Sequence, residues 1–215
     1  MSYQTYIFDL DGTLLDTLDD LTDSVNYALS FFGRKTYTRE TIRTFIGNGL
    51  SVLIERALGG EKDTDLHAKV LAKFKEYYRV HNRDKTRAYD GIDALLLELK
   101  KQGKKCAIVS NKADDAVKQL SAYFFPETIS SAVGENERAG IKRKPCPDSL
   151  LRVMEELNAD RDTTVYIGDS EVDIQTAKNA NLPCVSVCWG FKDEEFLLAN
   201  GATLIVKEPL EILAL

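Results

Sequence analysis

Three carboxylates follow the first strand-forming stretch of the chain. Asp9, Asp11 and Asp16 lie within residues 6–17, YIFDLDGTLLDT, where aromatic and β-branched residues end at Asp-Gly. This pattern predicts a buried strand that ends in a turn. Carboxylates placed there can bind a cation or exchange protons. We interpret Asp16 differently: together with Thr17, it is expected to cap the next helix by accepting hydrogen bonds from free amides.

Polar groups follow two later apolar runs in the same way. They are Ser110, Asn111 and Lys112 after residues 106–109, and the segment 168–173, GDSEVD, with Asp169, Ser170 and Asp173, after residues 164–167. In an open parallel sheet the ligand site lies outside the carboxyl ends of the strands. These side chains and the two aspartates after the first strand are therefore expected to converge on one rim.

Four aspartates on one rim raise one another's pKa unless a cation lies among them. An all-oxygen site suits Mg²⁺, which usually keeps several waters and meets substrate phosphates. No cysteine or histidine spacing fits zinc. Donors to the oxygens of an anion are also present: Ser110, the turn amides around Asp11 and Gly12, and Lys144 before Pro145. A metal and an oxyanion site on one rim indicate phosphoryl transfer.

The hydrophobic periodicity predicts the elements that carry these groups. Strands are expected at 3–8, 106–109, 128–132, 164–167, 184–187 and 203–206, and helices at 17–32, 39–45, 50–58, 65–80, 92–101, 114–123, 147–157 and 173–180. Strands separated by helices imply an α/β fold with a doubly wound parallel sheet. We predict a core domain of residues 1–15 and 85–215, with an all-helical domain of residues 16–84 inserted after the first strand.

Composition narrows the possible partners. The chain has 215 residues, of which 44% are hydrophobic and 29% charged. It contains no run of about 18 apolar residues, the length needed to cross a bilayer as a helix. Its net charge of −6 argues against nucleic-acid binding, although it permits one small anion in a local pocket. No secretion signal is recognised, so a cytoplasmic location is expected. The expected partner is a small molecule, and the oligomeric state stays open.

Four segments, in this order, resemble the motifs of the haloacid dehalogenase-like phosphohydrolases. They are DLDGT at residues 9–13, the Ser110 of VSN, Lys144-Pro145, and GDSEVD at residues 168–173. One DxD pair occurs easily by chance, but four motifs in order, each at a strand end or loop, form a specific pattern. They span the core domain from end to end, and the resemblance implies a Rossmann-like core.

The resemblance implies catalytic roles for three residues. Asp9 is expected to be the nucleophile that forms an aspartyl-phosphate. Asp11 is expected to act as general acid towards the leaving group and then as base towards water. Lys144 is expected to neutralise charge on the nucleophile and the phosphoryl group. An aspartate two residues after the nucleophile favours a phosphatase or phosphomutase, because cleavage of a carbon–halogen bond leaves no oxygen to protonate.

The resemblance also implies binding roles. The residues expected at the phosphate are Gly12, Thr13, Ser110 and Asn111. The expected Mg²⁺ ligands are Asp9, Asp11 through its backbone carbonyl, Asp169 and Asp173. For the last of these, direct binding and orientation of a metal-bound water both remain open.

The inserted helices resemble the helical C1-type cap of this superfamily, which closes over substrate to exclude water. Segments 45–50, FIGNGL, and 54–58, IERAL, are similar to the phosphoglycolate phosphatase group, which makes 2-phosphoglycolate the expected substrate. The residues expected to bind its carboxylate are Gly47, Asn48, Gly49 and Arg56. The alternative is a simple turn between helices, with Arg56 in solvent.

Other functions remain open at this point. A phosphatase of the same family could act on pyrophosphate, a sugar phosphate or a nucleotide. A β-phosphoglucomutase-like isomerase is expected to carry a His and an Arg in the first helices of the cap, and the first of these, residues 18–32, contains neither. A non-catalytic binding module would be expected to lack Asp9, Asp11 or Lys144, and all three are present.

Overall fold

The computed structural model describes residues 3–137 and 140–215 and divides the chain into two compact units. The α/β unit comprises Met1–Leu15 and Ala88–Leu215, and the helical unit comprises Asp16–Arg87. The helical unit thus ends at Arg87 rather than at the expected residue 84. Two short strands, β2 (Leu15–Asp16) and β3 (Arg87–Ala88), pair with each other at the unit boundary. Sequence periodicity did not predict them, because two residues are too few to show alternation.

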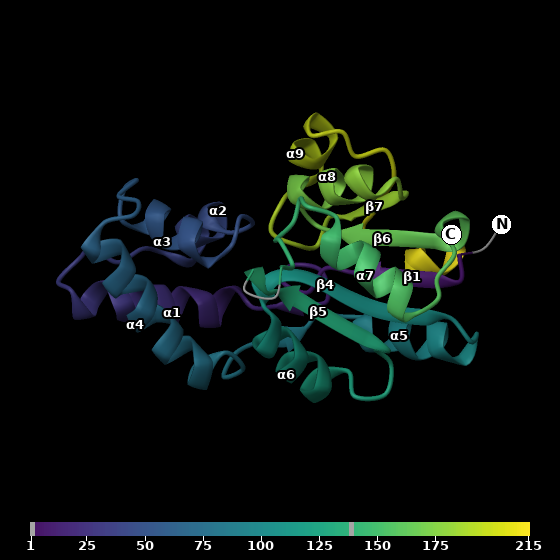
Figure 1. Cartoon of the computed structure of the whole chain (residues 1–215), viewed down its shortest axis with the longest axis horizontal. Helices are drawn as coiled ribbons and strands as arrows, with labels where there is room; N and C mark the ends of the chain where they lie inside the picture. Colours follow the sequence, from purple (N-terminus) through teal and green to yellow (C-terminus); the bar gives the residue numbers. More distant parts are fainter. Residues whose placement is uncertain (1–2, 138–139) are drawn as a thin grey trace. The chain divides into compact units, whose positions relative to one another are not determined.

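The α/β unit is built on a parallel sheet of six strands in the order β5-β4-β1-β6-β7-β8 (Figure 1). The strands are β1 (Thr5–Phe8), β4 (Lys105–Ala113), β5 (Ser131–Glu135), β6 (Thr164–Gly168), β7 (Cys184–Val187) and β8 (Ile205–Val206). In the centre, Phe8 pairs with Ile108 on one side and Ile167 on the other. The predicted doubly wound α/β fold is confirmed. The pairing of Phe8 with Ile167 places the carboxyl ends of β1 and β6 next to each other.

The largest differences from the predicted strand ranges are in β4 and β5, whereas β1, β6 and β8 differ by one or two residues at one end. β4 continues through Ala113 instead of ending at residue 109, because its pairing with β5 resumes after a register shift between Val109 and Ala113. β5 begins at Ser131, three residues after the predicted start at 128. Sequence periodicity cannot detect either shift, since both depend on which residues of the neighbouring strand are available for pairing.

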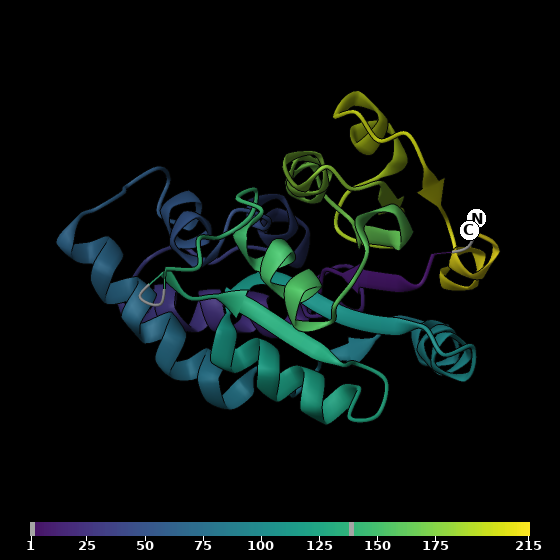
Figure 2. The same ribbon diagram turned by 45° about the vertical axis from the view of Figure 1, so that its right-hand side comes forward.

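Helices cover both faces of this sheet (Figure 2). α5 (Ile92–Lys101) and α6 (Asp114–Phe124) pack with Tyr6 and Phe8 of β1, whereas α7 (Asp148–Glu156) and α8 (Glu171–Ala180) pack with Ile7. Because both faces are buried, the central parts of β1, β4 and β6 are runs of buried, mostly apolar residues, at 6–8, 106–109 and 165–167, rather than alternating ones. The remaining short helices, α9 (Glu194–Ala199), η2 (Arg161–Thr163) and η3 (Pro209–Ala214), are too short for their periodicity to be recognised.

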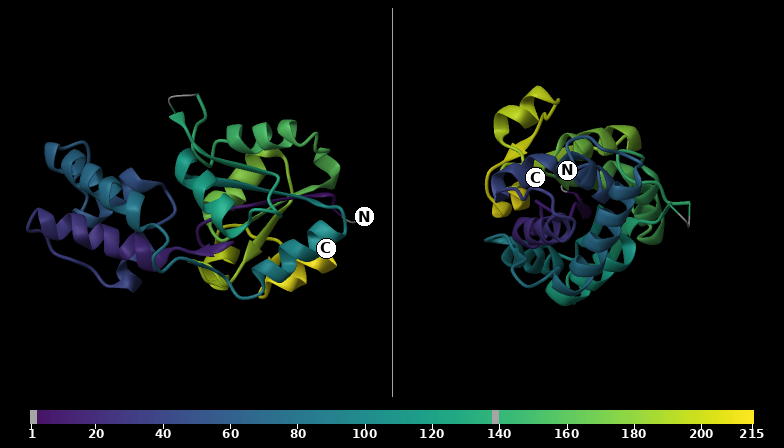
Figure 3. Two further views of the ribbon diagram at one scale, coloured as in Figure 1. Left: turned by 90° about the horizontal axis from the view of Figure 1, so that it is seen from below. Right: turned by 90° about the vertical axis from the view of Figure 1, so that its left-hand side faces the viewer.

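The helical unit contains four α-helices, as the sequence predicts. They are α1 (Leu18–Phe31), α2 (Arg39–Phe45), α3 (Leu50–Ala57) and α4 (Asp65–His81). α1 and α4 lie side by side (Figure 3). Leu29 of α1 and Phe74 of α4 are among the fully buried side chains of this unit. Within the described residues, no helix is both long and apolar enough to cross a membrane.

The start of α1 departs from the predicted capping. Thr17 occupies the N-cap position, but its side chain accepts no capping hydrogen bond. Asp16 accepts one long bond, 3.3 Å, from the Leu18 amide and is paired with the guanidinium groups of Arg39 and Arg87, each at 3.2 Å. The prediction that both residues cap the helix is therefore wrong for Thr17, and charge pairing dominates at Asp16.

Asp20 ties the two ends of the helical unit together. Its carboxylate is 2% exposed and accepts hydrogen bonds from the Lys85 amide and from both the amide and the hydroxyl of Thr86, at 2.7 to 3.2 Å. A buried carboxylate that accepts this many bonds is costly to replace, because the donors lose their partners as well.

Asp20→Ala is expected to lower the free energy of unfolding by about 2–4 kcal/mol, since it leaves buried donors unsatisfied. Asp23→Ala is the matched control on the same helix. Asp23 pairs with Lys85 at 2.6 Å but is about half exposed, so its loss should cost under about 1 kcal/mol. Urea unfolding followed by circular dichroism measures both, and equal effects would contradict this account.

Candidate active site

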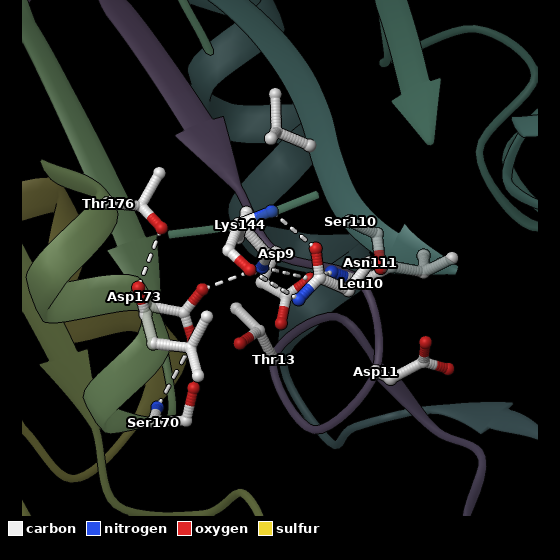
Figure 4. A network of polar contacts seen from close by, with 12 residues as sticks. Asp9, Leu10, Asp11, Thr13, Ser110, Asn111, Lys144, Ser170, Asp173 and Thr176 are labelled. Atoms are coloured by element: carbon white, nitrogen blue, oxygen red, sulfur yellow. Dashed lines mark hydrogen bonds and ion pairs between the residues drawn. The ribbon is translucent and has the colours of Figure 1, made fainter. Parts of the chain in front are cut away.

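The predicted site residues of the core converge at the carboxyl ends of β1, β4 and β6, all within the α/β unit (Figure 4). The buried members are Asp9, Thr13, Ser110, Lys144, Asp169 and Asp173. They come from four separate segments of the chain. The parallel register described above brings these segments to one rim, as the sequence predicts.

Lys144 joins two of the carboxylates. Its ammonium lies 2.9 Å from Asp9 Oδ1 and 2.7 Å from Asp173 Oδ1, and it donates to the Tyr166 hydroxyl at 3.0 Å. All four side chains are nearly inaccessible to solvent. Burial of an unpaired ammonium or carboxylate is very costly, so each of these charges depends on the others. The group therefore holds Asp9 in a fixed position.

Asp173 is saturated by protein donors. Its Oδ1 accepts bonds from Lys144 and from the Tyr166 hydroxyl at 3.0 Å, and its Oδ2 accepts bonds from the Ser170 amide and hydroxyl at 3.1 and 2.6 Å. The Ser170 contacts form the capping box of α8. Each carboxylate oxygen thus accepts two bonds, so the geometry favours an orienting role for Asp173 over direct metal coordination.

Asn111 fixes the backbone of Lys144. Its side-chain oxygen accepts the Lys144 amide at 2.6 Å, and its side-chain nitrogen donates to the Lys144 carbonyl at 3.1 Å. Both functions of the side-chain amide are therefore used within the protein. Ser110, the preceding residue, is buried, and its hydroxyl accepts the Lys112 amide at 3.3 Å.

Asp169 lies in a tightly packed position. Its Oδ2 accepts the Phe191 amide at 2.7 Å, and its Oδ1 is 3.4 Å from the Thr13 hydroxyl. A Cβ atom at Gly12 would lie 2.4 Å from Asp169 Oδ2, and one at Gly190 would lie 2.4 Å from Asp169 Cβ. Only glycine fits at either position, and Gly12 also adopts a positive φ of 85°.

The turn after β1 carries Asp11 and Gly12. The Gly12 amide donates to the Leu15 carbonyl at 2.9 Å, so the turn itself uses this donor. The Asp11 carboxylate points away from Asp9 in Figure 4 and forms an ion pair of 2.9 Å with the buried Lys112. Asp11 therefore belongs to the same rim but to a different charge pair.

The electrostatics of the site reflect crowded carboxylates. Burial raises the pKa of Asp9 to about 7, against the opposing effect of Lys144, and Asp173 and Asp11 add to the rise. Burial also raises the pKa of Asp169 well above its usual value, with further contributions from Asp173 and Asp9. Burial disfavours the charge on Lys144, but the carboxylates of Asp173 and Asp9 outweigh it and raise the pKa of the ammonium.

The donor set fits a hard divalent cation. Carboxylate oxygens of Asp9, Asp169 and Asp173 lie within 4.8 Å of one another. With Asp11, the site holds four carboxyl groups against the ammonium groups of Lys112 and Lys144, so full ionisation of all four would leave an excess of two negative charges. Oxygen ligands with this charge suit Mg²⁺ rather than zinc or copper.

The four residues predicted at the cap site belong to the helical unit. Gly47 and Gly49 both adopt a positive φ, 122° and 85°, and Gly49 precedes α3. Arg56 donates to the Phe45 carbonyl at 2.8 Å and to Asn48 Oδ1 at 2.7 Å. The alternative that left Arg56 in solvent is wrong, because this side chain holds the turn together. Binding of substrate by Gly47, Asn48, Gly49 and Arg56 stays a prediction.

Sequence reasoning missed two groups that shape the site, the Tyr166 hydroxyl and the backbone amide of Phe191. It placed Lys112 and Ser170 on the rim but assigned neither of them a role. Tyr166 was counted only as part of an apolar strand, although a hydroxyl in a buried strand needs a hydrogen-bond partner. Lys112 lies two residues after Ser110, and strand periodicity, had β4 been extended, would have placed both on one face.

The raised pKa of Asp9 predicts a pH-dependent stability for the protein in EDTA. Between about pH 4 and 7 the folded state retains a proton that the unfolded state has lost, so the free energy of unfolding falls as the pH rises. We expect a decrease of a few kcal/mol across this range relative to Asp9→Asn, which lacks the titrating group. Urea unfolding at stepped pH measures the difference, and parallel profiles would contradict it.

Comparisons with known proteins agree with this geometry. The family model described as haloacid dehalogenase-like hydrolase matches residues 6–187. A phosphoglycolate phosphatase from Psychrobacter arcticus is 38% identical over 89% of this chain and 86% of its own, and one from Colwellia psychrerythraea is 34% identical over 92% and 90%.

Solved structures give the same result. A predicted phosphoglycolate phosphatase from Lactobacillus delbrueckii subsp. bulgaricus superposes with a TM-score of 0.94 at 39% identity, covering 99% of this chain and 97% of its own. A predicted phosphatase from Clostridium acetobutylicum gives a TM-score of 0.86 at 28% identity, covering all of both chains. The chain therefore belongs to the haloacid dehalogenase-like hydrolases, and within them to the phosphoglycolate phosphatase-like group of phosphoric monoester hydrolases.

Proposed function

We propose that this protein is a Mg²⁺-dependent phosphatase that hydrolyses a small phosphomonoester through a covalent intermediate on Asp9. The observation that carries the proposal is the buried ammonium of Lys144, 2.9 Å from Asp9 Oδ1. A carboxylate at a strand end that is fixed by a cation and lies beside the hydroxyl groups of Thr13 and Ser110 (Figure 4) is suited to attack phosphorus.

In the first step, an oxygen of Asp9 bonds to phosphorus as the bond to the leaving oxygen breaks. Asp11 gives a proton to that oxygen, which departs as an alcohol. Lys144 offsets charge on Asp9 and on the phosphoryl oxygens. The Ser110 and Thr13 hydroxyls supply donors to the phosphoryl group, and Asn111 acts by holding the Lys144 backbone.

In the second step, water attacks phosphorus and the bond to Asp9 breaks. Asp11, now a carboxylate, takes the proton from this water. Inorganic phosphate leaves, and Asp9 is regenerated with its ion pair to Lys144. The net reaction adds one water to the ester, so the same residue serves as acid and then as base.

Asp9, Asp169 and the Asp11 carbonyl are the groups we propose to hold Mg²⁺. When bound, the ion offsets the negative charge of the phosphoryl group and of the carboxylates. Asp173 is proposed to support this site from behind, since both its oxygens are used by Lys144, Tyr166 and Ser170. Of the two alternatives for Asp173, the proposal thus takes the orienting role rather than direct binding of the metal.

The proposed substrate is 2-phosphoglycolate. Its support is the name carried by relatives that match this chain over most of its length, and the turn at Gly47–Gly49 resembles that group. Pyrophosphate, sugar phosphates and nucleotides are the competing substrates for the same chemistry. A mutase is less compatible, because α1 contains neither His nor Arg.

Asp9→Asn is expected to abolish turnover while keeping the fold. The amide cannot attack phosphorus, so kcat should fall by about three orders of magnitude or more. Lys144 keeps its partner Asp173 in this variant, which is why the fold should survive. Steady-state phosphate release and circular dichroism test the two halves. Substantial activity in a folded variant would contradict the nucleophile.

A substrate panel tests the metal and the substrate together. We expect phosphate release with Mg²⁺ to be fastest from 2-phosphoglycolate, with kcat/KM at least about tenfold above pyrophosphate, sugar phosphates and nucleoside monophosphates, equivalent to about 1.4 kcal/mol. EDTA should remove the activity, and Mg²⁺ should raise the melting temperature of the protein. A flat profile would exclude the named substrate, and activity in EDTA would contradict the metal requirement.

A further inference from the structure

The ion pair between Lys112 and Asp11 has no role in the mechanism above. The two charged groups are 2.9 Å apart, and their side chains are 3% and 16% exposed. An ammonium buried to this degree is costly unless an opposite charge lies beside it. The pair is therefore a built feature of the site rather than a surface contact.

The backbone around Lys112 is held from two directions. The pairing of β4 with β5 shifts register between Val109 and Ala113, and irregularities of this kind redirect side chains next to active sites. The Lys112 amide also donates to the Ser110 hydroxyl at 3.3 Å. On the β5 side, a Cβ atom at Gly134 would lie 2.5 Å from the Lys112 carbonyl oxygen. Only a glycine permits this close approach.

Asp11 has a task that depends on its direction. In-line displacement places the leaving oxygen on the far side of phosphorus from the attacking oxygen. The Asp11 carboxylate accordingly points away from Asp9 in Figure 4, and its ion pair of 2.9 Å with Lys112 holds it there. An unrestrained carboxylate occupies several rotamers, and a displacement of about 1 Å can cost about 100-fold in rate.

We propose that Lys112 is a positioning residue that holds the Asp11 carboxylate in line with the leaving-group oxygen. The inference rests on the proposed function, because it takes Asp11 to be the general acid. No bond to the substrate forms or breaks at Lys112. Its contribution is the orientation of Asp11, so it matters most for esters whose leaving group needs a proton.

The test compares three esters in the wild type and in Lys112→Met. They are 2-phosphoglycolate, 2-hydroxyethyl phosphate and p-nitrophenyl phosphate. The first two release alkoxides that need a proton, whereas p-nitrophenolate leaves without one. Since kcat/KM reports the step that transfers phosphate to Asp9, we expect it to fall about 10- to 100-fold for both alkyl esters and less than about threefold for the nitrophenyl ester.

Each other outcome overturns the proposal. An equal loss on all three esters would show a structural role, and a loss confined to 2-phosphoglycolate would show that Lys112 binds the substrate carboxylate. No loss on the alkyl esters would remove any role. Failure of the proposed function is distinct, since the wild type would then hydrolyse none of the esters.

A double variant supplies the readout that a structural role would not give. In the Asp11→Asn background, Lys112→Met should change kcat/KM by less than about twofold, because the side-chain amide at position 11 has no acidic proton for Lys112 to position. A further large loss would overturn the proposal. Lys118→Met is the matched control, as Lys118 pairs with Asp114 at 2.7 Å on the exposed side of α6. Circular dichroism checks folding, and Lys112→Gln replaces Lys112→Met should that variant unfold.

Discussion

The site depends on the placement of one buried ammonium between two buried carboxylates. Lys144 lies 2.9 Å from Asp9 and 2.7 Å from Asp173, and removal of any member would leave an uncompensated charge in a region that water does not reach. This requirement connects three segments that are distant in sequence: the end of β1, the loop that carries Lys144, and the first turn of α8. Asn111 adds the fourth by holding the backbone of Lys144 from β4. The proposed nucleophile, Asp9, is therefore oriented by the folded core before any substrate arrives, and the cost of that order is met during folding rather than during reaction.

Close packing around Asp169 serves the same purpose by steric means. Gly12 and Gly190 approach this carboxylate so closely that a methyl group at either position would overlap it, and the Phe191 amide fixes one oxygen at 2.7 Å. The carboxylate consequently has little freedom to follow a ligand. Mg²⁺ demands near-ideal oxygen geometry, so a rigid carboxylate at Asp169 would suit the proposed metal site better than a flexible one.

The sequence predicts the parts of the site that depend on local pattern, and misses those that depend on pairing between segments. Asp9, Asp169 and Ser110 follow apolar runs, and a parallel sheet brings such positions together whatever the details of packing. Lys112 was placed on the rim, but its pairing with Asp11 was missed because β4 continues past its apolar run only through a register shift against β5. Tyr166 looks like any apolar strand residue, and its importance arises from Lys144 and Asp173, which come from other segments. In the helical unit the periodicity of the four helices was sufficient, but the contact of Arg56 with the Phe45 carbonyl requires the conformation of a turn that no period describes.

The two ammonium groups at the rim neutralise different carboxylates. Lys144 belongs to Asp9 and Lys112 to Asp11, so the proposed nucleophile and the proposed acid each have a cation of their own. If all four carboxylates were ionised, both cations together would still leave two negative charges in excess, and a phosphate monoester would add about two more at neutral pH. The raised pKa values of Asp9 and Asp169 express the cost of that excess in the absence of a metal. The proposed divalent cation would offset this charge and favour the ionised carboxylates when the phosphate ester binds. Without it, the same carboxylates would oppose binding of the ester.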